Sequence, residues 1–196
     1  MSPILTFDRT ALVLSAGGEH VVAWHLGVLA GLAEHGVDAR RARRVVGTSA
    51  GALVAARLAG GDALSAALPG PAWPARQRVV AIDALTGGRP HVDGALGSAT
   101  NADLAAGAGV SRVLVLDANG PAADPLSRLW AAAFEQEVAA LEARGIAVAA
   151  IRAGDEDRAA MGADPMDGAS AAAAVEAGRL AAARWMARVA PRAVMM

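Results

Sequence analysis

Short, nearly continuous apolar runs alternate along this chain with longer stretches of helical periodicity. The apolar runs, rich in Val, Ile, Leu and Ala, are residues 11–15, 44–48, 79–84, 112–118 and 146–152. Such runs are typical of strands that are covered on both faces. The stretches with apolar residues three and four apart, as in helices, are residues 22–35, 50–59, 126–144 and 170–189. This alternation predicts an α/β fold with a mostly parallel central sheet and helices on both faces, in three α/β/α layers.

The size of the chain and its apolar content fit one packed unit. A length of 196 residues without a linker or repeat predicts a single compact domain over residues 1–196. Hydrophobic residues make up 55% of the chain and the mean hydropathy is +0.36, but much of this is alanine, which favours helices. The longest uncharged apolar runs have about a dozen residues, fewer than the ~20 that cross a bilayer. Segments 68–77 and 120–125, which carry prolines, are expected to be loops.

The composition argues against several classes of function. A chain without cysteine has no disulfide, no thiolate nucleophile and no Cys–metal site. A net charge of −1 argues against nucleic-acid binding. The first residues do not combine a basic region with a following apolar core, so no signal peptide is predicted and a cytoplasmic location is expected.

The segment Gly47-Thr48-Ser49-Ala50-Gly51 joins the second apolar run to the helical stretch that follows it. A serine placed between two glycines at a turn from strand to helix is typical of the nucleophile elbow of serine hydrolases. The glycines permit a sharp turn that lifts the hydroxyl out of the sheet, and the helix directs its first N–H groups toward the same place. Ser49 is therefore the candidate nucleophile.

A glycine-rich loop, Ser15-Ala16-Gly17-Gly18-Glu19-His20, follows the first apolar run. Such a loop exposes backbone N–H groups that a ligand can approach closely. Dinucleotide binding is one interpretation, but no G-x-G-x-x-G can be written here. A tight turn without a ligand is a second. The expected elbow at the neighbouring strand end favours a third, an oxyanion hole at Gly17 and Gly18, where two fixed N–H groups hold the charge on an attacked carbonyl oxygen.

A serine nucleophile needs a base. Four histidines are available: His20, His25, His35 and His91. His25 and His35 fall in a helical pattern and are expected on a partly solvated face, whereas His20 closes the glycine loop and could line the site. Asp93, followed by Gly94, is either part of a simple turn or a carboxylate at the carboxyl edge of the sheet, where ligands bind in such folds.

Together these motifs resemble those of the patatin-like phospholipase family, the lipid acyl hydrolases that use a Ser–Asp dyad. The resemblance is to a shortened member of actinobacterial type and covers most of the chain. The glycine loop, a helix like Trp24-His25-Leu26-Gly27-Val28-Leu29-Ala30-Gly31-Leu32, and the elbow match the family's elements in order. Asp93-Gly94-Ala95 matches the family's Asp-Gly-Gly/Ala motif and is followed by Ser98-Ala99-Thr100-Asn101-Ala102-Asp103-Leu104. The tail at residues 157–167 is also similar.

The resemblance implies a role for each motif. Ser49 is the nucleophile, and Asp93 activates it directly, without a histidine. Backbone N–H groups at Gly17 and Gly18 form the oxyanion hole. The elbow and motif glycines are Gly47, Gly51 and Gly94. The implied reaction cleaves a lipid or a small ester through an acyl-enzyme, and it implies no metal and no cofactor.

Two alternatives stay open on the sequence. A Ser-His-Asp esterase would use one of the four histidines, although an α/β-hydrolase places its histidine last in the chain, after the acid. A catalytically silent patatin-like binding or scaffold module fits the loop's departures from the family pattern. These departures are at Ser15, Ala16, His20 and Val21, and the stretch between Ser49 and Asp93 is shorter than usual.

The expected partners follow from the resemblance to lipid acyl hydrolases and from the charge pattern. The basic run Arg40-Arg41-Ala42-Arg43-Arg44 is either a solvated loop or a peripheral contact with an anionic membrane surface. The short stretch between Ser49 and Asp93 predicts an open apolar site, which a lipid surface or a second copy of the chain would cover. We therefore expect a lipid or small ester substrate, peripheral membrane contact and a homo-oligomer, but no nucleic acid.

Overall fold

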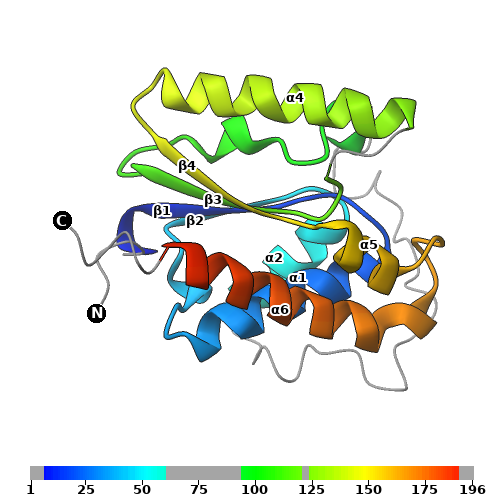
Figure 1. The fold of residues 1–196 in the computed structure, drawn as a ribbon. Coiled ribbons are helices and arrows are strands. Elements are labelled where there is room, and N and C mark those ends of the chain that lie inside the picture. Colours follow the sequence, from blue (N-terminus) through cyan, green and yellow to red (C-terminus); the bar gives the residue numbers. More distant parts are fainter. Residues whose placement is uncertain (1–6, 61–93, 121–123, 190–196) are drawn as a thin grey trace.

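The structure, a computed structural model, describes residues 7–60, 94–120 and 124–189 (Figure 1). In these ranges four strands form one parallel sheet in the order β2-β1-β3-β4. They are β1 (Thr10–Leu14), β2 (Arg44–Gly47), β3 (Arg112–Asp117) and β4 (Ala147–Arg152). Leu14 pairs with Gly47 of β2 and with Leu116 of β3, so the three strands end close together at one carboxyl edge.

Helices connect these strands and follow them. The α-helices are α1 (Glu19–Glu34), α2 (Ala50–Ala59), α4 (Pro125–Glu142), α5 (Asp155–Met161) and α6 (Ala171–Val189). Short 3₁₀ turns are η2 (Phe7–Arg9), η3 (Ala39–Arg41), η4 (Gly94–Leu96), η5 (Ala102–Ala105) and η6 (Gly168–Ser170).

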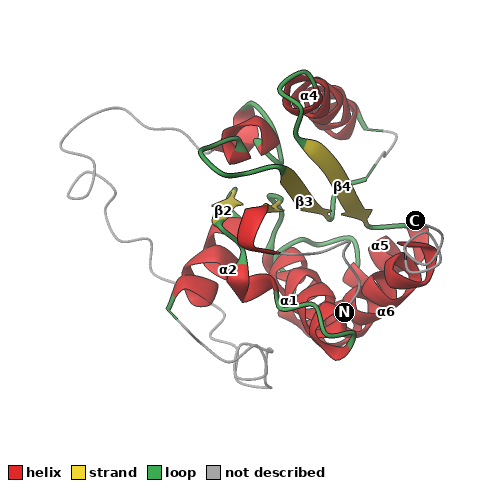
Figure 2. Cartoon of the chain, turned by 90° about the vertical axis from the view of Figure 1, so that its left-hand side faces the viewer, coloured by secondary structure: helices red, strands yellow, loops and turns green. Residues whose placement is uncertain are grey.

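Both faces of the sheet are covered (Figures 1 and 2). α4 and η5 lie on one face, and α1, α2, α5 and α6 lie on the other. Along β1, Leu12 and Leu14 belong to the core beside α1 and α6, whereas Ala11 and Val13 belong to the core beside α4. Successive strand residues point to opposite faces, so a strand between two helical layers needs an uninterrupted apolar run.

α1 and α6 pack together at short range on the lower face in Figure 1. A Cβ atom on Gly27 would collide with the carbonyl oxygen of Val175, and one on Gly178 would collide with that of Trp24. Glycine at these positions lets the two backbones approach. The Trp24 side chain is fully buried in the core that these helices form with the sheet.

The predicted α/β fold is confirmed. Four of the five predicted strands lie in the described ranges, and α2 has the predicted bounds. The fifth predicted strand, 79–84, and the proline-rich segment 68–77 lie outside the described residues. α5 was not predicted; its N-terminus is capped by Asp157, whose Oδ2 accepts the Gly154 N–H at 2.7 Å.

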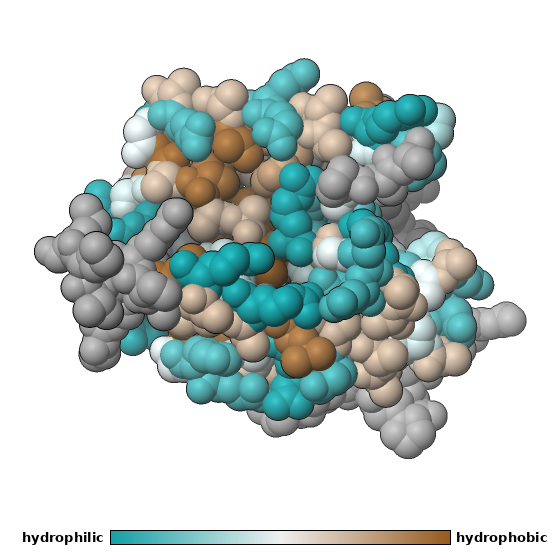
Figure 3. Space-filling view, in the orientation of Figure 1, coloured by the Kyte–Doolittle hydropathy of each residue, from teal (hydrophilic) through white to brown (hydrophobic). Residues whose placement is uncertain are grey.

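The outer strands are less covered than the central ones. In β4, Val148 and Ala150 are only half-buried against the core beside α4. Figure 3 shows apolar surface gathering between α4 and this strand. No helix in the described part of the chain is long and apolar enough to cross a membrane.

Candidate active site

Ser49 occupies a strained backbone position at the turn between β2 and α2. Its φ of 50° and ψ of −112° are uncommon for a residue with a side chain. Backbone strain of this kind costs on the order of 1–3 kcal/mol and is found most often at functional sites. The serine is the N-cap of α2, yet its hydroxyl makes no capping hydrogen bond, and the residue is exposed. The residue is therefore open to solvent, and its hydroxyl does not stabilise the helix.

The two glycines of the elbow are required by close packing. A Cβ atom on Gly47 would collide with the backbone of Gly51, one turn further on. A Cβ atom on Gly51 would collide with the carbonyl of Leu14, the last residue of β1. The Thr48 N–H also donates to the Leu14 carbonyl, at 3.1 Å. The start of α2 is thus pressed against the end of β1, which fixes the position of the turn.

The glycine loop begins at the end of β1, beside the elbow. The Ser15 N–H donates to the Leu116 carbonyl at 3.1 Å, and the Ala16 N–H donates to the Ala99 carbonyl at 2.6 Å. Among the residues that the structure describes, the N–H groups of Gly17 and Gly18 have no hydrogen-bond acceptor. Both glycines are only half-buried. These two donors are therefore available to a ligand at the carboxyl edge, as an oxyanion hole requires.

The connector that follows α5 packs against the glycine loop. A Cβ atom on Gly18 would collide with the carbonyl of Pro165, so the loop and the 162–168 connector lie in contact. His20 Nδ1 lies 3.0 Å from the Met161 carbonyl oxygen. The tail that resembles the family in sequence is thus a packing partner of the glycine loop.

Asn101 links the elbow to the turn that precedes η5. Its Nδ2 donates to Thr48 Oγ1 at 3.0 Å and to the Ser98 carbonyl at 2.9 Å. Its φ of 51° lies in the left-handed region, where asparagine is tolerated better than most residues. Thr48 directly precedes Ser49, so this amide holds the backbone of the elbow.

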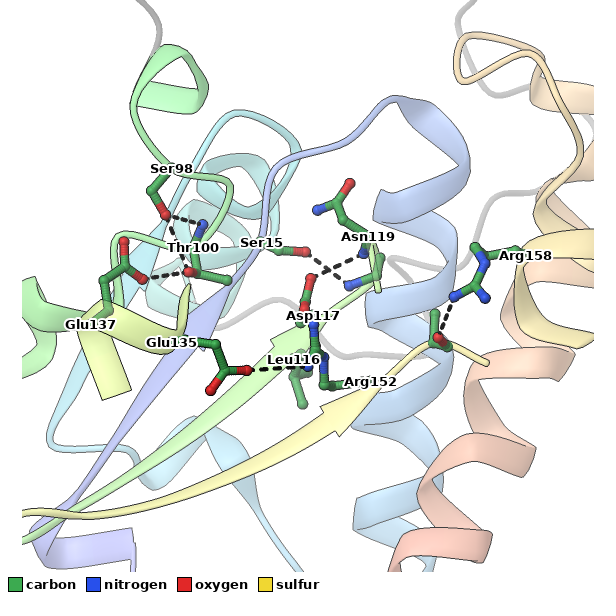
Figure 4. Close-up of polar contacts among 12 residues, drawn as sticks. Ser15, Ser98, Thr100, Leu116, Asp117, Asn119, Glu135, Glu137, Arg152 and Arg158 are labelled. Atoms are coloured by element: carbon green, nitrogen blue, oxygen red, sulfur yellow. Dashed lines mark hydrogen bonds and ion pairs between the residues drawn. The ribbon is translucent and has the colours of Figure 1, made fainter. Parts of the chain in front are cut away.

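Glu137 anchors the same turn to α4 (Figure 4). Its Oε2 accepts the Thr100 hydroxyl at 2.5 Å and the Ala102 N–H at 2.8 Å. The side chain is buried, and Thr100 also lies 3.3 Å from the Ser98 hydroxyl. Sequence analysis missed Glu137, because a lone glutamate in a helical pattern looks the same as a solvated one.

Asp93 and His91 lie outside the described residues. Gly94, the residue directly after Asp93, is described. A Cβ atom on Gly94 would lie 3.4 Å from Thr48 Cγ2 and 3.4 Å from Asn101 Nδ2. The residue that follows the candidate base therefore packs against the residue that precedes the candidate nucleophile.

The expectation that His25 lies on a partly solvated face is wrong. The side chain is fully buried, since α1 turns it toward the sheet. Its Nε2 lies 3.2 Å from the Leu116 carbonyl and 3.5 Å from Ser15 Oγ. Burial lowers the pKa of His25 from 6.5 to about 4, against a smaller raising effect of the Leu116 hydrogen bond. His35 is exposed as expected, with Nδ1 2.8 Å from the Gly31 carbonyl.

The basic run 40–44 lies at the opposite edge of the sheet from Ser49. Arg44 begins β2, whereas Ser49 follows its end. Arg40 is paired locally with Asp38, at 2.8 Å between Nε and Oδ1. A membrane contact through this run would hold the elbow away from the lipid. In the described ranges no cluster of His, Asp and Glu side chains could hold a metal ion.

Comparison with known proteins agrees with this geometry. The family model described as patatin-like phospholipase matches residues 12–69, which include the glycine loop, α1 and the elbow. This part of the chain is similar to the patatin-like phospholipase family. Residues 93 and 94 lie beyond the matched segment. No curated protein matches the chain significantly.

This match relates the chain broadly to lipid acyl hydrolases. The matched segment contains the strained Ser49 and the Gly17 and Gly18 N–H groups, which have no acceptor among the described residues.

Proposed function

We propose that this patatin-like protein is a serine acyl hydrolase that cleaves carboxylic or phospholipid esters with a Ser49–Asp93 dyad. The observation that carries the proposal is Ser49 itself, an exposed, uncapped serine held at a φ of 50° between two obligatory glycines. A serine needed only as a helix cap would adopt an extended backbone and bond to the helix N–H groups.

The proposed reaction has two halves. Ser49 Oγ attacks the ester carbonyl carbon while its proton passes to the Asp93 carboxylate. The N–H groups of Gly17 and Gly18 hold the oxygen that becomes negative. The intermediate then expels the alcohol, which takes the proton from Asp93, and leaves an acyl-serine. Water attacks this ester, gives a proton to Asp93, and the collapse returns that proton to Ser49 and releases the acid.

The packing of Gly94 against Thr48 supports Asp93 as the base. The two motifs approach through residues that are covalently next to the proposed dyad, since a Cβ atom on Gly94 would lie 3.4 Å from Thr48 Cγ2. The described histidines are less suitable. His25 is buried beneath the sheet edge, His35 lies at the far end of α1, and His20 Nδ1 is engaged with the Met161 carbonyl.

The substrate range follows from the open surroundings of Ser49. Leu53, one turn further along α2, is 40% exposed, and Leu96 of η4 is 69% exposed. We propose that short or water-soluble acyl esters are cleaved better than long ones, and that lipid or a second copy of the chain covers this apolar surface.

A panel of p-nitrophenyl esters from acetate to palmitate tests the proposal, with wild type, Ser49→Ala and Asp93→Asn side by side. We expect Ser49→Ala to abolish turnover and Asp93→Asn to lower kcat by ~10²–10⁴-fold, as for a lost general base. His20→Gln or His91→Gln with a loss as large as that of Asp93→Asn would favour the Ser-His-Asp esterase. Wild type with no turnover on any ester, and with no labelling by a fluorophosphonate, would favour the silent module.

A further inference from the structure

We infer that Asn119 is a positioning residue for the oxyanion hole, because its side chain fixes the peptide group that carries the Gly17 N–H. This inference rests on the proposed acyl hydrolase function. Asn119 lies two residues beyond the end of β3, far from both motifs in sequence. Its Nδ2 donates to the Ala16 carbonyl oxygen at 2.9 Å.

The Ala16 carbonyl and the Gly17 N–H belong to one peptide group. The peptide bonds of the described chain are trans, so this C=O and this N–H point in opposite directions. A donor that holds the carbonyl oxygen therefore also sets the direction of the N–H. Glycine at position 17 has few conformational restraints of its own, so an external restraint is needed to hold one direction.

The order of the strands in the sheet indicates the direction of the Gly17 N–H. β1 lies between β2 and β3. Asn119 follows β3, and Ser49 follows β2. We expect a carbonyl held from the β3 side to turn its N–H partner toward the β2 side, where Ser49 lies. The Gly17 N–H has no acceptor in the described ranges, so it remains available there.

Asn119 is itself held by the end of β3 (Figure 4). Its backbone N–H donates to Asp117 Oδ1 at 3.0 Å, and Asp117 Oδ2 accepts Arg152 Nε at 3.1 Å. Asp117 is buried, so the hydrogen bond that it accepts from the Asn119 N–H keeps the backbone of Asn119 in place. Next to it, the Ala118 N–H donates to Ser15 Oγ at 3.0 Å. Both ends of the short segment from Ser15 to Ala16 are therefore tied to the residues after β3.

Two variants test the inference. Asn119→Asp keeps the shape of the side chain but removes the donor to the Ala16 carbonyl. Asn119→Ala removes the donor without adding a charge beside Asp117, and it keeps the test open if the aspartate variant does not fold. Glu34→Gln is the matched control, since it removes one charge at the exposed far end of α1.

The first measurement needs no catalysis. We expect the ¹⁵N order parameter of the Gly17 amide to fall from the ~0.85 of rigid backbone to below ~0.6 in both Asn119 variants and to stay unchanged in Glu34→Gln. A Gly17 amide that stays ordered in folded Asn119→Ala and Asn119→Asp would overturn the inference. If Gly17 loses order while wild type has no Ser49-dependent turnover, the positioning role stands and the hydrolase proposal fails.

The second measurement concerns the reaction. Loss of one oxyanion donor costs ~10²–10³-fold in kcat, and a misaligned donor should cost roughly ten- to a hundred-fold. We expect KM to change less than about twofold, because the donor acts mainly on the transition state. The inhibition constant of a trifluoromethyl ketone, whose adduct with Ser49 carries an oxyanion, should weaken by the same factor as kcat. An active wild type whose kcat and ketone affinity both survive Asn119→Ala would refute the role.

Discussion

The Asn101 side-chain amide donates a 3.0 Å hydrogen bond to the hydroxyl of Thr48, the residue directly before Ser49. Gly94 lies against both partners of this bond, with its Cβ position 3.4 Å from Asn101 Nδ2 and from Thr48 Cγ2. The turn after β2 and Gly94 are therefore joined through one asparagine. This contact links two segments that lie far apart in the sequence.

Two substitutions of Asn101 distinguish the contribution of its side-chain hydrogen bonds from the contribution of its backbone conformation. Asn101→Gly keeps a φ of 51° without strain but loses the amide, whereas Asn101→Ala loses the amide and retains the strain. We expect the alanine variant to be less stable than the glycine variant by about 1 kcal/mol in urea unfolding. Turnover should fall by a similar factor in both, because both lose the bond to Thr48. Full activity in Asn101→Gly would mean that the amide does not hold the elbow.

We expect Ser49 to be required for turnover although its backbone conformation lowers the stability of the fold. Ser49→Gly relieves the strain of a φ of 50°, and Ser49→Ala does not. We expect both variants to be inactive and Ser49→Gly to be the more stable of the two by about 1 kcal/mol. Thermal unfolding and ester turnover measure the two effects. Equal melting temperatures for the two variants would contradict a strained turn.

Gly51 and Gly60 offer a matched pair on one helix. A Cβ on Gly51 would collide with the Leu14 carbonyl, whereas one on Gly60, at a φ of −71°, would have its nearest neighbour at 3.5 Å. We expect Gly51→Ala to lower the free energy of unfolding by roughly 1–3 kcal/mol, as overpacking does, and to impair turnover. Gly60→Ala should be neutral or slightly stabilising in the same assays. Normal activity in Gly51→Ala would show that the elbow tolerates a displaced α2.

His25 should make the fold sensitive to acid. Its pKa is lowered to about 4 by burial, and its Nδ1 has no hydrogen-bond partner in the described structure, so the protonated ring would carry an unsatisfied buried donor. In the unfolded chain the pKa is about 6.5. The unfolded state therefore binds a proton first as the pH falls, and stability that is complete above about pH 6.5 is lost toward pH 4.

The loss attributable to His25 is roughly 3 kcal/mol over this range, from about 1.4 kcal/mol for each pH unit. Urea unfolding at pH 7, 5.5 and 4 measures it. His25→Gln keeps a donor for the Leu116 carbonyl but does not titrate, so its free energy of unfolding should depend less on pH by this amount. Parallel pH profiles for wild type and His25→Gln would rule out the assigned role of burial.

Local sequence determined the elements and the turns. Apolar runs of strand length predicted β1 to β4 because a strand covered on both faces has no polar side, and helical spacing predicted α1, α2, α4 and α6. The turn between β2 and α2 could be predicted because a sharp turn requires glycine at fixed positions, and a Cβ atom on Gly47 or Gly51 would collide with backbone atoms. These are short-range steric requirements, and a short segment contains all of the information for them.

Only the tertiary structure decided which of these segments meet. The order β2-β1-β3-β4 brings Ala118 within 3.0 Å of Ser15, 103 residues away, and puts Asn119 beside the glycine loop. It also buries His25 and Glu137, which the helical pattern alone did not distinguish from solvated residues. A periodic pattern gives the face of a helix but not the partner that covers it, because the pairing of parallel strands is fixed by long-range packing and not by any one segment.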